Sequence, residues 1–247
     1  MGRRQIGLAL AAMAATGILY LLTLMPGAGS TPAVAAEQVT SPVVMDAMQR
    51  VMVQLDACDT EAEARVSAAR TVRRGSAGYI HLDRQYRVLG AMAETQEEAE
   101  QMCEKLRTAG MNASCYPVET KALTMKVTAG QMQIAALTAA LHAMDMASTQ
   151  PEAIARQMDS GEIDADRARG LVAMLVSDVE SAQADFSDAG ARGLLSERLN
   201  DALTEAIGAL EPLARDDGQT DLVLAGQIRG AGMKIWFSRA TLAELSS

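Results

Sequence analysis

Three cysteines and two histidines are the residues of this chain best suited to metal binding, redox chemistry or nucleophilic catalysis. Cys58, Cys103 and Cys115 form no CxxC pair, and only His81 and His142 are available to complete a set of metal ligands. Structural zinc sites pair their ligands at short spacing, so this arrangement argues against a metal site. Two of the three thiols can form a disulfide if the domain is exported, or all three can be small buried side chains.

The sequence contains none of the short motifs that mark common catalytic sites. There is no GxSxG, no HExxH, no Walker loop and no GxGxxG. The glycine-rich run at 226–232 has no strand–turn–helix context and is interpreted as a flexible connection between helices. Asp164, Asp166 and Asp178 fall in a helical pattern and are interpreted as its solvated face. We therefore expect no enzyme activity and no cofactor.

The composition is that of a globular protein whose core uses small and flexible apolar side chains. Hydrophobic residues make up 49% of the 247 residues and aromatic residues only 3%, and there are 16 methionines. This length is enough for one or two domains. The formal net charge of −9 argues against nucleic acid as a partner, because affinity for it comes from clustered Lys and Arg.

The first 26 residues have the pattern of a membrane anchor. Arg3 and Arg4 precede an uncharged run at 6–25, and about 20 helical residues span the hydrocarbon core of a bilayer. The positive-inside rule then predicts a cytoplasmic N-terminus with the bulk of the chain extracytoplasmic. Alternatively, the run belongs to a signal peptide cleaved near the small residues at 33–36, and the remainder is secreted. Either interpretation exports residues 37–247.

Residues 27–46 are interpreted as a linker, and residues 47–119 as an α/β domain. The linker is rich in Gly, Ser, Thr, Pro and Ala. After it, alternation and helical spacing predict strands at 51–55, 79–82, 86–89 and 113–118 and helices at 60–74 and 95–110. This order, β-α-β-β-α-β, predicts a four-stranded antiparallel sheet with two helices on one face and the other face open.

Residues 120–247 are predicted to form a helical region. Apolar residues recur at helical spacing in 128–146, 161–188, 194–213 and from 222 onward, and Pro151 suits the first turn of a short helix. Amphipathic helices of ordinary length joined at Gly or Pro predict a small antiparallel bundle. The fold class expected for the whole chain is α+β, with a transmembrane helix, the sheet domain and the bundle in that order.

Both strand–helix halves of the sheet domain carry a short motif. The first is VQLDAC at 53–58, followed by Ala64, and the second is YRV at 86–88, followed by EEA at 97–99 and Leu106 to Gly110. These resemble the VQxGxF and yRVxxGxF strands and the helix residues of the sporulation-related repeat, or SPOR, domain. That family binds the glycan strands of peptidoglycan in bacterial cell envelopes. The resemblance covers about residues 47–119 and implies the same four-stranded topology.

The resemblance implies that the open sheet face meets the sugar chain and that Gln54 and Arg87 bind it. Both side chains can donate hydrogen bonds to sugar hydroxyls and N-acetyl carbonyls. Strand alternation is expected to place Gln54 with Asp56 and Cys58 on that face, beside Arg87. The alternatives are that Gln54 is merely an exposed strand residue and that Arg87 forms a surface ion pair, for example with Glu119 or Asp56.

The motifs depart from the family at four positions. Asp56 and Ala91 stand where the family has Gly, and Cys58 and Ala93 stand where it has an aromatic residue. We expect a membrane-anchored protein that binds peptidoglycan in cell division or sporulation, with the helical region contacting other envelope proteins. The alternative is an adaptor that binds no glycan and acts through protein contacts of that region.

The predicted topology also bears on the cysteines. Cys58 ends the first strand of the domain and Cys115 lies in the last, and these strands are neighbours in the expected sheet. A disulfide between Cys58 and Cys115 is therefore a hypothesis.

Overall fold

Residues 49–119 form the sheet that the sequence pattern predicts. In the computed structural model, which describes residues 38–215 and 218–244, four antiparallel strands lie in the order β3-β4-β2-β5. The elements are β2 (Gln49–Cys58), α1 (Glu61–Val72), β3 (Tyr79–Asp83), β4 (Gln85–Ala93), α2 (Gln96–Thr108) and β5 (Ser114–Glu119). The α+β class and the β-α-β-β-α-β order are confirmed.

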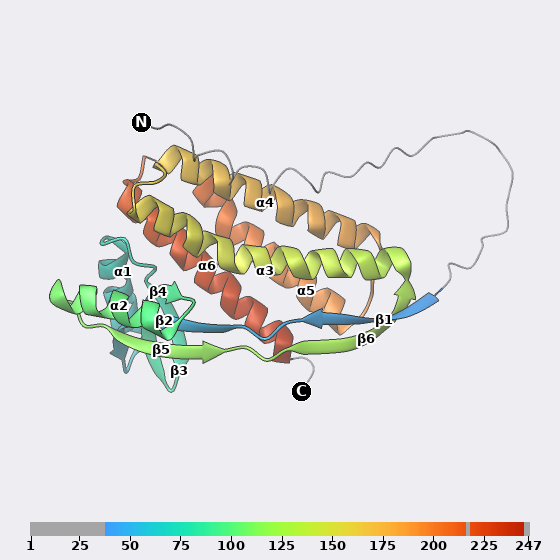
Figure 1. The fold of residues 1–247 in the computed structure, drawn as a ribbon, viewed down its shortest axis with the longest axis horizontal. Helices are drawn as coiled ribbons and strands as arrows, with labels where there is room; N and C mark the ends of the chain where they lie inside the picture. The colour runs from blue at the N-terminus through green and yellow to red at the C-terminus, as the bar shows by residue number, and fades with distance from the viewer. Residues whose placement is uncertain (1–37, 216–217, 245–247) are drawn as a thin grey trace, which may run out of the picture. The chain divides into compact units, whose positions relative to one another are not determined.

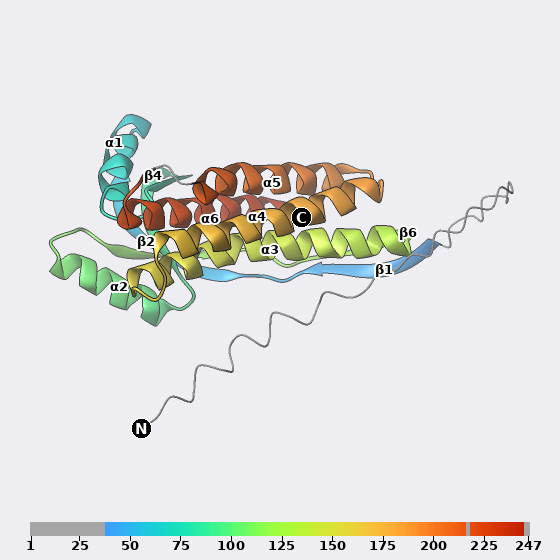
Figure 2. The same ribbon diagram turned by 90° about the horizontal axis from the view of Figure 1, so that it is seen from above.

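Helices α1 and α2 cover one face of this sheet, as predicted (Figures 1 and 2). Thr60 and Thr95 start them, each accepting a hydrogen bond from the backbone N–H three residues on. Apolar side chains of the strands and of the two helices are buried between them, among them Val53, Leu55, Ala64, Ala68, Val88 and Cys103.

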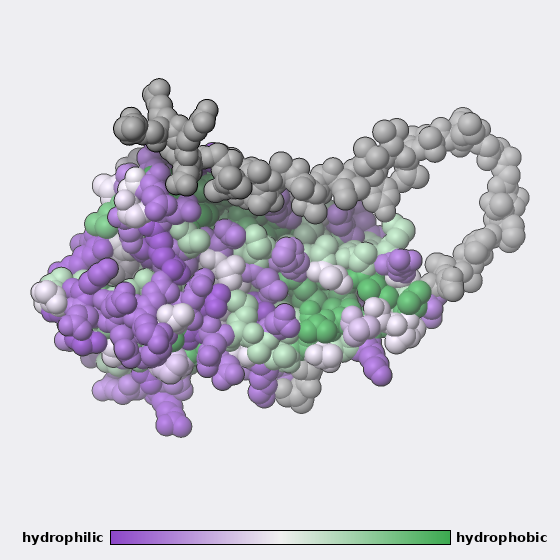
Figure 3. Space-filling model, in the orientation of Figure 1, coloured by the Kyte–Doolittle hydropathy of each residue, from purple (hydrophilic) through white to green (hydrophobic). Residues whose placement is uncertain are grey.

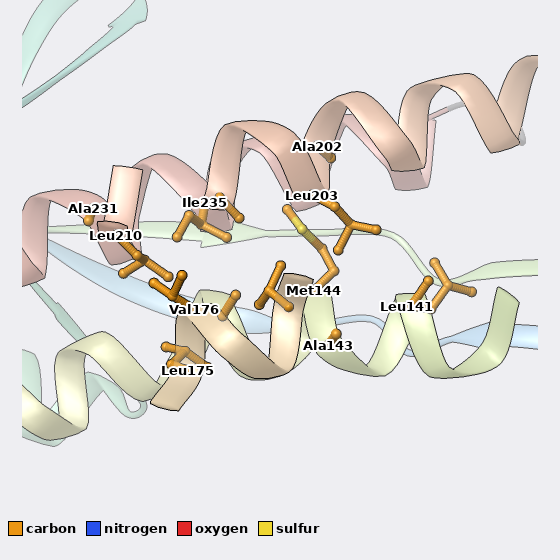
Figure 4. Packing of buried hydrophobic residues seen from close by; sticks show 14 of the residues in the cluster. Leu141, Ala143, Met144, Leu175, Val176, Ala202, Leu203, Leu210, Ala231 and Ile235 are labelled. Carbon is orange, nitrogen blue, oxygen red and sulfur yellow. The ribbon is translucent and has the colours of Figure 1, made fainter. Parts of the chain in front are cut away.

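The C-terminal half forms a helical bundle, as predicted (Figures 1 and 2). Its elements are α3 (Gln131–Asp159), α4 (Ala165–Asp188), α5 (Leu194–Leu210), the 3-10 turn η1 (Glu211–Ala214) and α6 (Asp221–Ala243). Figure 4 shows the buried side chains that these helices bring together, including Leu141, Met144, Val176, Leu203, Leu210 and Ile235.

The prediction of a new helix at Pro151 is wrong, because α3 continues through it. Pro151 is buried against α6, where a Cβ added at Gly232 would lie 2.9 Å from the Cβ of Pro151. A proline inside a helix removes one backbone hydrogen bond. Close packing against a neighbouring helix offsets that loss, and the sequence around Pro151 gives no sign of the neighbour.

The predicted linker at 27–46 contains a strand, which corrects that interpretation. β1 (Gln38–Met45) pairs antiparallel with β6 (Leu123–Gly130) in a separate two-stranded sheet that runs along α3 (Figure 1). Val43, Met45 and Leu123 are buried in the core of the bundle. The other face of the ribbon is exposed and carries Thr40, Pro42 and Val44 from β1 and Thr124, Lys126 and Thr128 from β6. The Thr and Pro of β1 therefore resembled a tether. The predicted domain boundaries at 46 and 120 leave β1 and β6 on opposite sides of the sheet domain, and the pairing of these two strands was not predicted.

The predicted anchor at 1–26 and the first part of the predicted linker lie outside the described residues. Within 38–215 and 218–244, no helix has the length and apolar character needed to cross a bilayer. The residues from Glu37 to Ser247 group into one compact unit.

The second face of the four-stranded sheet is not open along its whole length, contrary to expectation. Met233 and Trp236 of α6 pack onto Met52, Leu89 and Met92 of the sheet, and all five side chains are almost completely buried. We call these five residues the Trp236 cluster.

The glycine-rich run at 226–232 makes this packing possible. It lies inside α6 and is not a flexible connection, so that interpretation was wrong. A Cβ added at Gly226 would lie 2.7 Å from the carbonyl oxygen of Ser76, and one at Gly230 would lie 3.0 Å from that of Ala77. The absent side chains allow α6 to approach the backbone between α1 and β3.

Buried charges reinforce the contact between the sheet and the bundle. Arg229 of α6 donates to Glu152 of α3 at 3.3 Å and to the carbonyl oxygen of Gly75 at 2.8 Å, and it also pairs with Asp159. Glu152 accepts from the backbone N–H of Met92 in β4 at 3.3 Å. These bonds join α3, α6 and the sheet through side chains that are far apart in sequence.

Candidate functional site

The predicted site residues Gln54 and Arg87 lie next to each other on the sheet face opposite α1 and α2. Nη1 of Arg87 donates a hydrogen bond of 2.5 Å to Oε1 of Gln54. Because a guanidinium has only donors, the amide oxygen must face it, and the amide NH2 of Gln54 is left for another partner. The sequence therefore identified two residues that the fold brings together.

Asp56 and Cys58 do not share this face, contrary to the prediction from simple alternation. The pairing of β2 with β4 shifts register on both sides of Gln54, and such a bulge reverses which side chains point to each face. Oδ2 of Asp56 accepts from Ser67 of α1 at 2.7 Å, and Cys58 packs against the cluster that contains Ala64. The shift thus removes an acidic side chain from the face of Gln54.

Asp83 and Tyr116 complete a network around Arg87. The Tyr116 hydroxyl donates to Oδ2 of Asp83 at 3.0 Å, and Nη2 of Arg87 lies 3.6 Å from the same oxygen. The guanidinium carbon of Arg87 lies 4.5 Å from the centre of the Tyr116 ring, within range of a cation–π interaction. The ion-pair partner of Arg87 is Asp83, and neither Glu119 nor Asp56, which had been considered, makes this contact.

Aromatic rings line the boundary between this network and α6. His81 stacks on Phe237 with ring centres 4.3 Å apart, and its ring centre lies 6.2 Å from that of Tyr116. Tyr79 stacks on the same Phe237 at 5.2 Å. We call Gln54, His81, Asp83, Arg87 and Tyr116 the Arg87 cluster. Of these, Gln54, His81, Arg87 and Tyr116 are half-buried, and the Asp83 side chain is 40% exposed.

The surroundings keep the ring groups of the Arg87 cluster uncharged near neutral pH. Burial lowers the pKa of His81, and Arg87 adds to that effect while Asp83 opposes it. Burial also raises the pKa of Tyr116, as does its hydrogen bond to Asp83. A neutral imidazole both donates and accepts a hydrogen bond, so the cluster offers mixed donors and acceptors.

A groove of about 300 Å³ lies beside Gln54 at the edge of the sheet, where β2 and the start of β5 meet the C-terminal end of α2. Its lining includes Gln54, Asp56, Arg107, Asn112 and Ser114. Ser114 is paired directly with Gln54 in the sheet. Polar groups therefore extend from Tyr116 through Gln54 to the beginning of β5.

The structure does not bring Cys58 and Cys115 together. β5 pairs with β2 only as far as Gln54, and Cys115 lies opposite Val53. Cys58 is five residues farther along the strand than Val53, or about 16 Å at 3.3 Å per residue. The neighbouring strands were predicted correctly, but their register excludes this pair. All three thiols are free, and the one next to Cys115 is Cys103.

Sequence reasoning missed Asp83, His81, Tyr116 and Phe237 as parts of the site. Asp83 ends β3 beside Arg84, whose φ of 52° marks a turn, and its sequence position suggests no more than that turn. Phe237 comes from α6, more than a hundred residues away in the chain. Among the described residues, no group of three or more His, Cys, Asp or Glu side chains could hold a metal ion.

Comparison with known proteins finds no relative for this chain. No protein-family model matches it, and neither does a curated protein or a solved structure. The likeness to the SPOR domain stays an interpretation of the two sequence motifs.

Proposed function

We propose that the Arg87 cluster binds a linear glycan, namely the glycan strand of peptidoglycan. The observation that carries the proposal is the hydrogen bond between Arg87 and Gln54, which sets two donor-bearing side chains side by side on a half-exposed sheet face. Arg87 offers the N–H groups at the tip of its guanidinium that Gln54 does not use, since its Nε is buried, and Gln54 offers its amide NH2, to hydroxyl and N-acetyl oxygens. Asp83, with 40% of its side chain exposed, is an acceptor for a sugar hydroxyl.

Aromatic contact area also favours a sugar ligand. Sugar rings have apolar C–H faces that pack on aromatic rings, and the two motifs of this chain lack the aromatic residues typical of the SPOR family. Tyr116, His81 and Phe237 bring rings to the same face from other elements. They are a local substitute for the missing side chains.

The extent of the polar surface suits a polymer better than a single sugar. The groove next to Gln54 continues the donors and acceptors toward Asn112 and Ser114, so a ligand longer than one sugar ring has further polar groups to contact. On this proposal the protein is a wall-targeting module, held outside the cytoplasm by its predicted anchor, that acts in cell division or sporulation. The Trp236 cluster confines binding to the part of the face that α6 leaves accessible.

The experiment is a pull-down of the unit Glu37–Ser247 with insoluble peptidoglycan, both intact and stripped of stem peptides. The Gln54→Ala/Arg87→Ala double variant should bind at least about tenfold more weakly, because it loses hydrogen bonds worth about 1–3 kcal/mol each. The matched control is Gln96→Ala/Arg65→Ala, which changes the same residue types at exposed positions of α2 and α1. Binding that the control retains and the double variant loses supports the proposal, whereas no sedimentation with either material refutes it.

Two variants of Tyr116 distinguish the contribution of its hydroxyl to glycan binding from that of its ring. Tyr116→Phe removes the hydroxyl that holds Asp83 but keeps the ring under Arg87. Glycan packing on the ring predicts that Tyr116→Phe binds within about threefold of the wild type, while Tyr116→Ala binds much more weakly. Equal losses in both variants would exclude a stacking role.

A second function, an adaptor that acts through the helical region, is favoured by one observation. A groove of about 490 Å³ lies between β6 and the α4–α5 connection, lined by apolar residues that include Val127, Leu137 and Leu194. Figure 3 shows hydrophobic residues on the surface toward β6, whereas the end with α1 and α2 is mainly hydrophilic. The adaptor function predicts that Leu194→Glu abolishes self-association or partner binding in light scattering and leaves glycan sedimentation unchanged.

A further inference from the structure

Cys103 and Cys115 are the one pair of thiols that the fold brings into contact within the described residues. Their sulfur atoms lie 3.5 Å apart. Cys103 is completely buried on α2, and Cys115 is half-buried on β5. Cys58 is separated from both by the register of β2 and packs on the α1 side of the sheet.

The elements that carry the two thiols are already tied together. Nε of Arg107 in α2 donates to the carbonyl oxygen of Ala113, just before β5, at 3.2 Å, and the backbone N–H of Met111 donates to the carbonyl oxygen of Leu106 at 3.0 Å. A disulfide bond is about 2.05 Å long, so the sulfur atoms need to approach by about 1.5 Å. Rotation of the two adjacent side chains brings the sulfur atoms closer together.

We propose that Cys103 and Cys115 form an intramolecular disulfide when the protein meets a disulfide oxidant, such as a dithiol–disulfide oxidoreductase or a low-molecular-weight disulfide. The thiolate of Cys115, the more exposed residue, attacks the disulfide of the oxidant, forms a mixed disulfide and releases one thiol. The thiolate of Cys103 then attacks the sulfur of Cys115 and releases the second thiol. The two protons and two electrons lost by the cysteines thereby reduce the oxidant to two thiols.

The site makes oxidation slow unless the solution is alkaline or the oxidant is supplied by an enzyme. Burial, together with the hydrogen bond to Cys103, raises the pKa of Cys115 to about 11. Since the thiolate is the attacking species, only a small fraction of Cys115 is reactive near neutral pH. The rate of oxidation should therefore rise by about tenfold per pH unit below that pKa.

The disulfide closes a short loop that borders the proposed glycan site. The two cysteines are 12 positions apart, and the residues between them include Arg107, Asn112 and Ser114, which line the groove beside Gln54. Closing such a loop restricts the unfolded chain. Oxidation should raise the Tm by about 5–10 °C and hold this side of the groove in place.

Peptide mapping tests the pairing directly. The unit Glu37–Ser247 is incubated with oxidised glutathione at mildly alkaline pH, quenched with acid, denatured, alkylated and digested with trypsin. Cleavage at Lys105 and Arg107 separates the two cysteines, so the bridge joins two peptides that reduction releases. The expected result is a Cys103–Cys115 linked pair from monomeric protein with Cys58 alkylated. Alkylation of all three thiols, or a bridge that includes Cys58, would overturn the proposal.

Thermal unfolding with and without a reductant supplies the second measurement. The wild type and Cys58→Ala should both lose about 5–10 °C in Tm on reduction, whereas Cys103→Ala and Cys115→Ala should show no such shift. If either of these two variants fails to fold, the wild-type peptide map still decides the pairing. A reductant-dependent shift that Cys58→Ala abolishes would contradict it.

Discussion

Two neighbouring parts of one sheet face differ in what lies over them. The Trp236 cluster is apolar, completely buried and sealed by α6, and the charged groups beside it are joined to one another. The Arg87 cluster lies on the same face, at the other end of β2 and β4, but it stays half-exposed and its polar groups keep unused donors. The comparison indicates that α6 divides the face into a structural part and a part available to a ligand.

The largest effect on stability is expected from a cavity in the Trp236 cluster. Trp236→Ala removes a fully buried indole and should lower the free energy of unfolding by about 4 kcal/mol, measured by urea denaturation. Trp236→Phe is the control, because it keeps an aromatic ring and removes an indole N–H that has no hydrogen-bond partner within the described residues. If Trp236→Ala lowers the free energy of unfolding no more than Arg87→Ala does, the two parts of the face do not differ in their contribution to stability.

The next effect comes from the buried ion pair beside the Trp236 cluster. Arg229→Met leaves Glu152, whose side chain is 3% exposed, with a weaker partner in Arg156 at 3.7 Å, and should cost about 3 kcal/mol of stability. Adding Glu152→Gln should recover part of that loss, because an amide tolerates burial better than an unpaired carboxylate. Strict additivity of the two changes in a double-mutant cycle would exclude coupling between them.

Opposite pH dependences should separate the two parts further. Burial raises the pKa of Glu152 from 4.5 to about 7. Between these values the folded state holds a proton that the unfolded state has lost, so stability falls as the pH rises from 4.5 to 7. Burial lowers the pKa of His81 from 6.5, and stability from that group is lost as the pH falls below 6.5. Urea denaturation midpoints are to be measured between pH 4.5 and 7. In Glu152→Gln the midpoint should no longer fall because of this carboxyl as the pH rises, and in His81→Asn it should no longer fall because of this imidazole as the pH decreases.

The smallest effect on stability is expected in the Arg87 cluster. Arg87→Ala breaks one hydrogen bond to Gln54, the contact with the Tyr116 ring and a 3.6 Å contact with a carboxylate whose side chain is 40% exposed, and should cost about 1 kcal/mol. The same variant should nevertheless reduce glycan sedimentation. A stability loss comparable to that of Trp236→Ala would show that Arg87 is a structural residue.

Much of the sheet domain was predictable because its information is local. The predicted helices at 60–74 and 95–110 begin where Thr60 and Thr95 cap α1 and α2, and apolar alternation located each strand of the four-stranded sheet. Gln54 and Arg87 were identified from motifs within those strands. The face shared by Asp56 and Cys58 was predicted incorrectly, because a bulge at Gln54 has no strong sequence signature and reverses the alternation.

The remaining errors concern contacts between distant segments. The strand Gln38–Met45 was taken for a linker, since its partner β6 lies about 80 residues later. The glycines at 226–232 were taken for a flexible connection, since the backbone they approach lies between α1 and β3. In both cases the residues alone allow several conformations, and only the partner selects one.

The sequence by itself determined the elements of the four-stranded sheet domain and their order, because helix caps, apolar periodicity and turn residues act within a few positions of the chain. It also named the two residues at the centre of the candidate site. Tertiary structure alone decided that α6 covers part of the sheet face, that Tyr116 lies against Arg87 and Phe237 against His81, and that Cys115 meets Cys103 instead of Cys58. Those outcomes depend on strand register and on close packing between segments far apart in the chain, which no local pattern encodes.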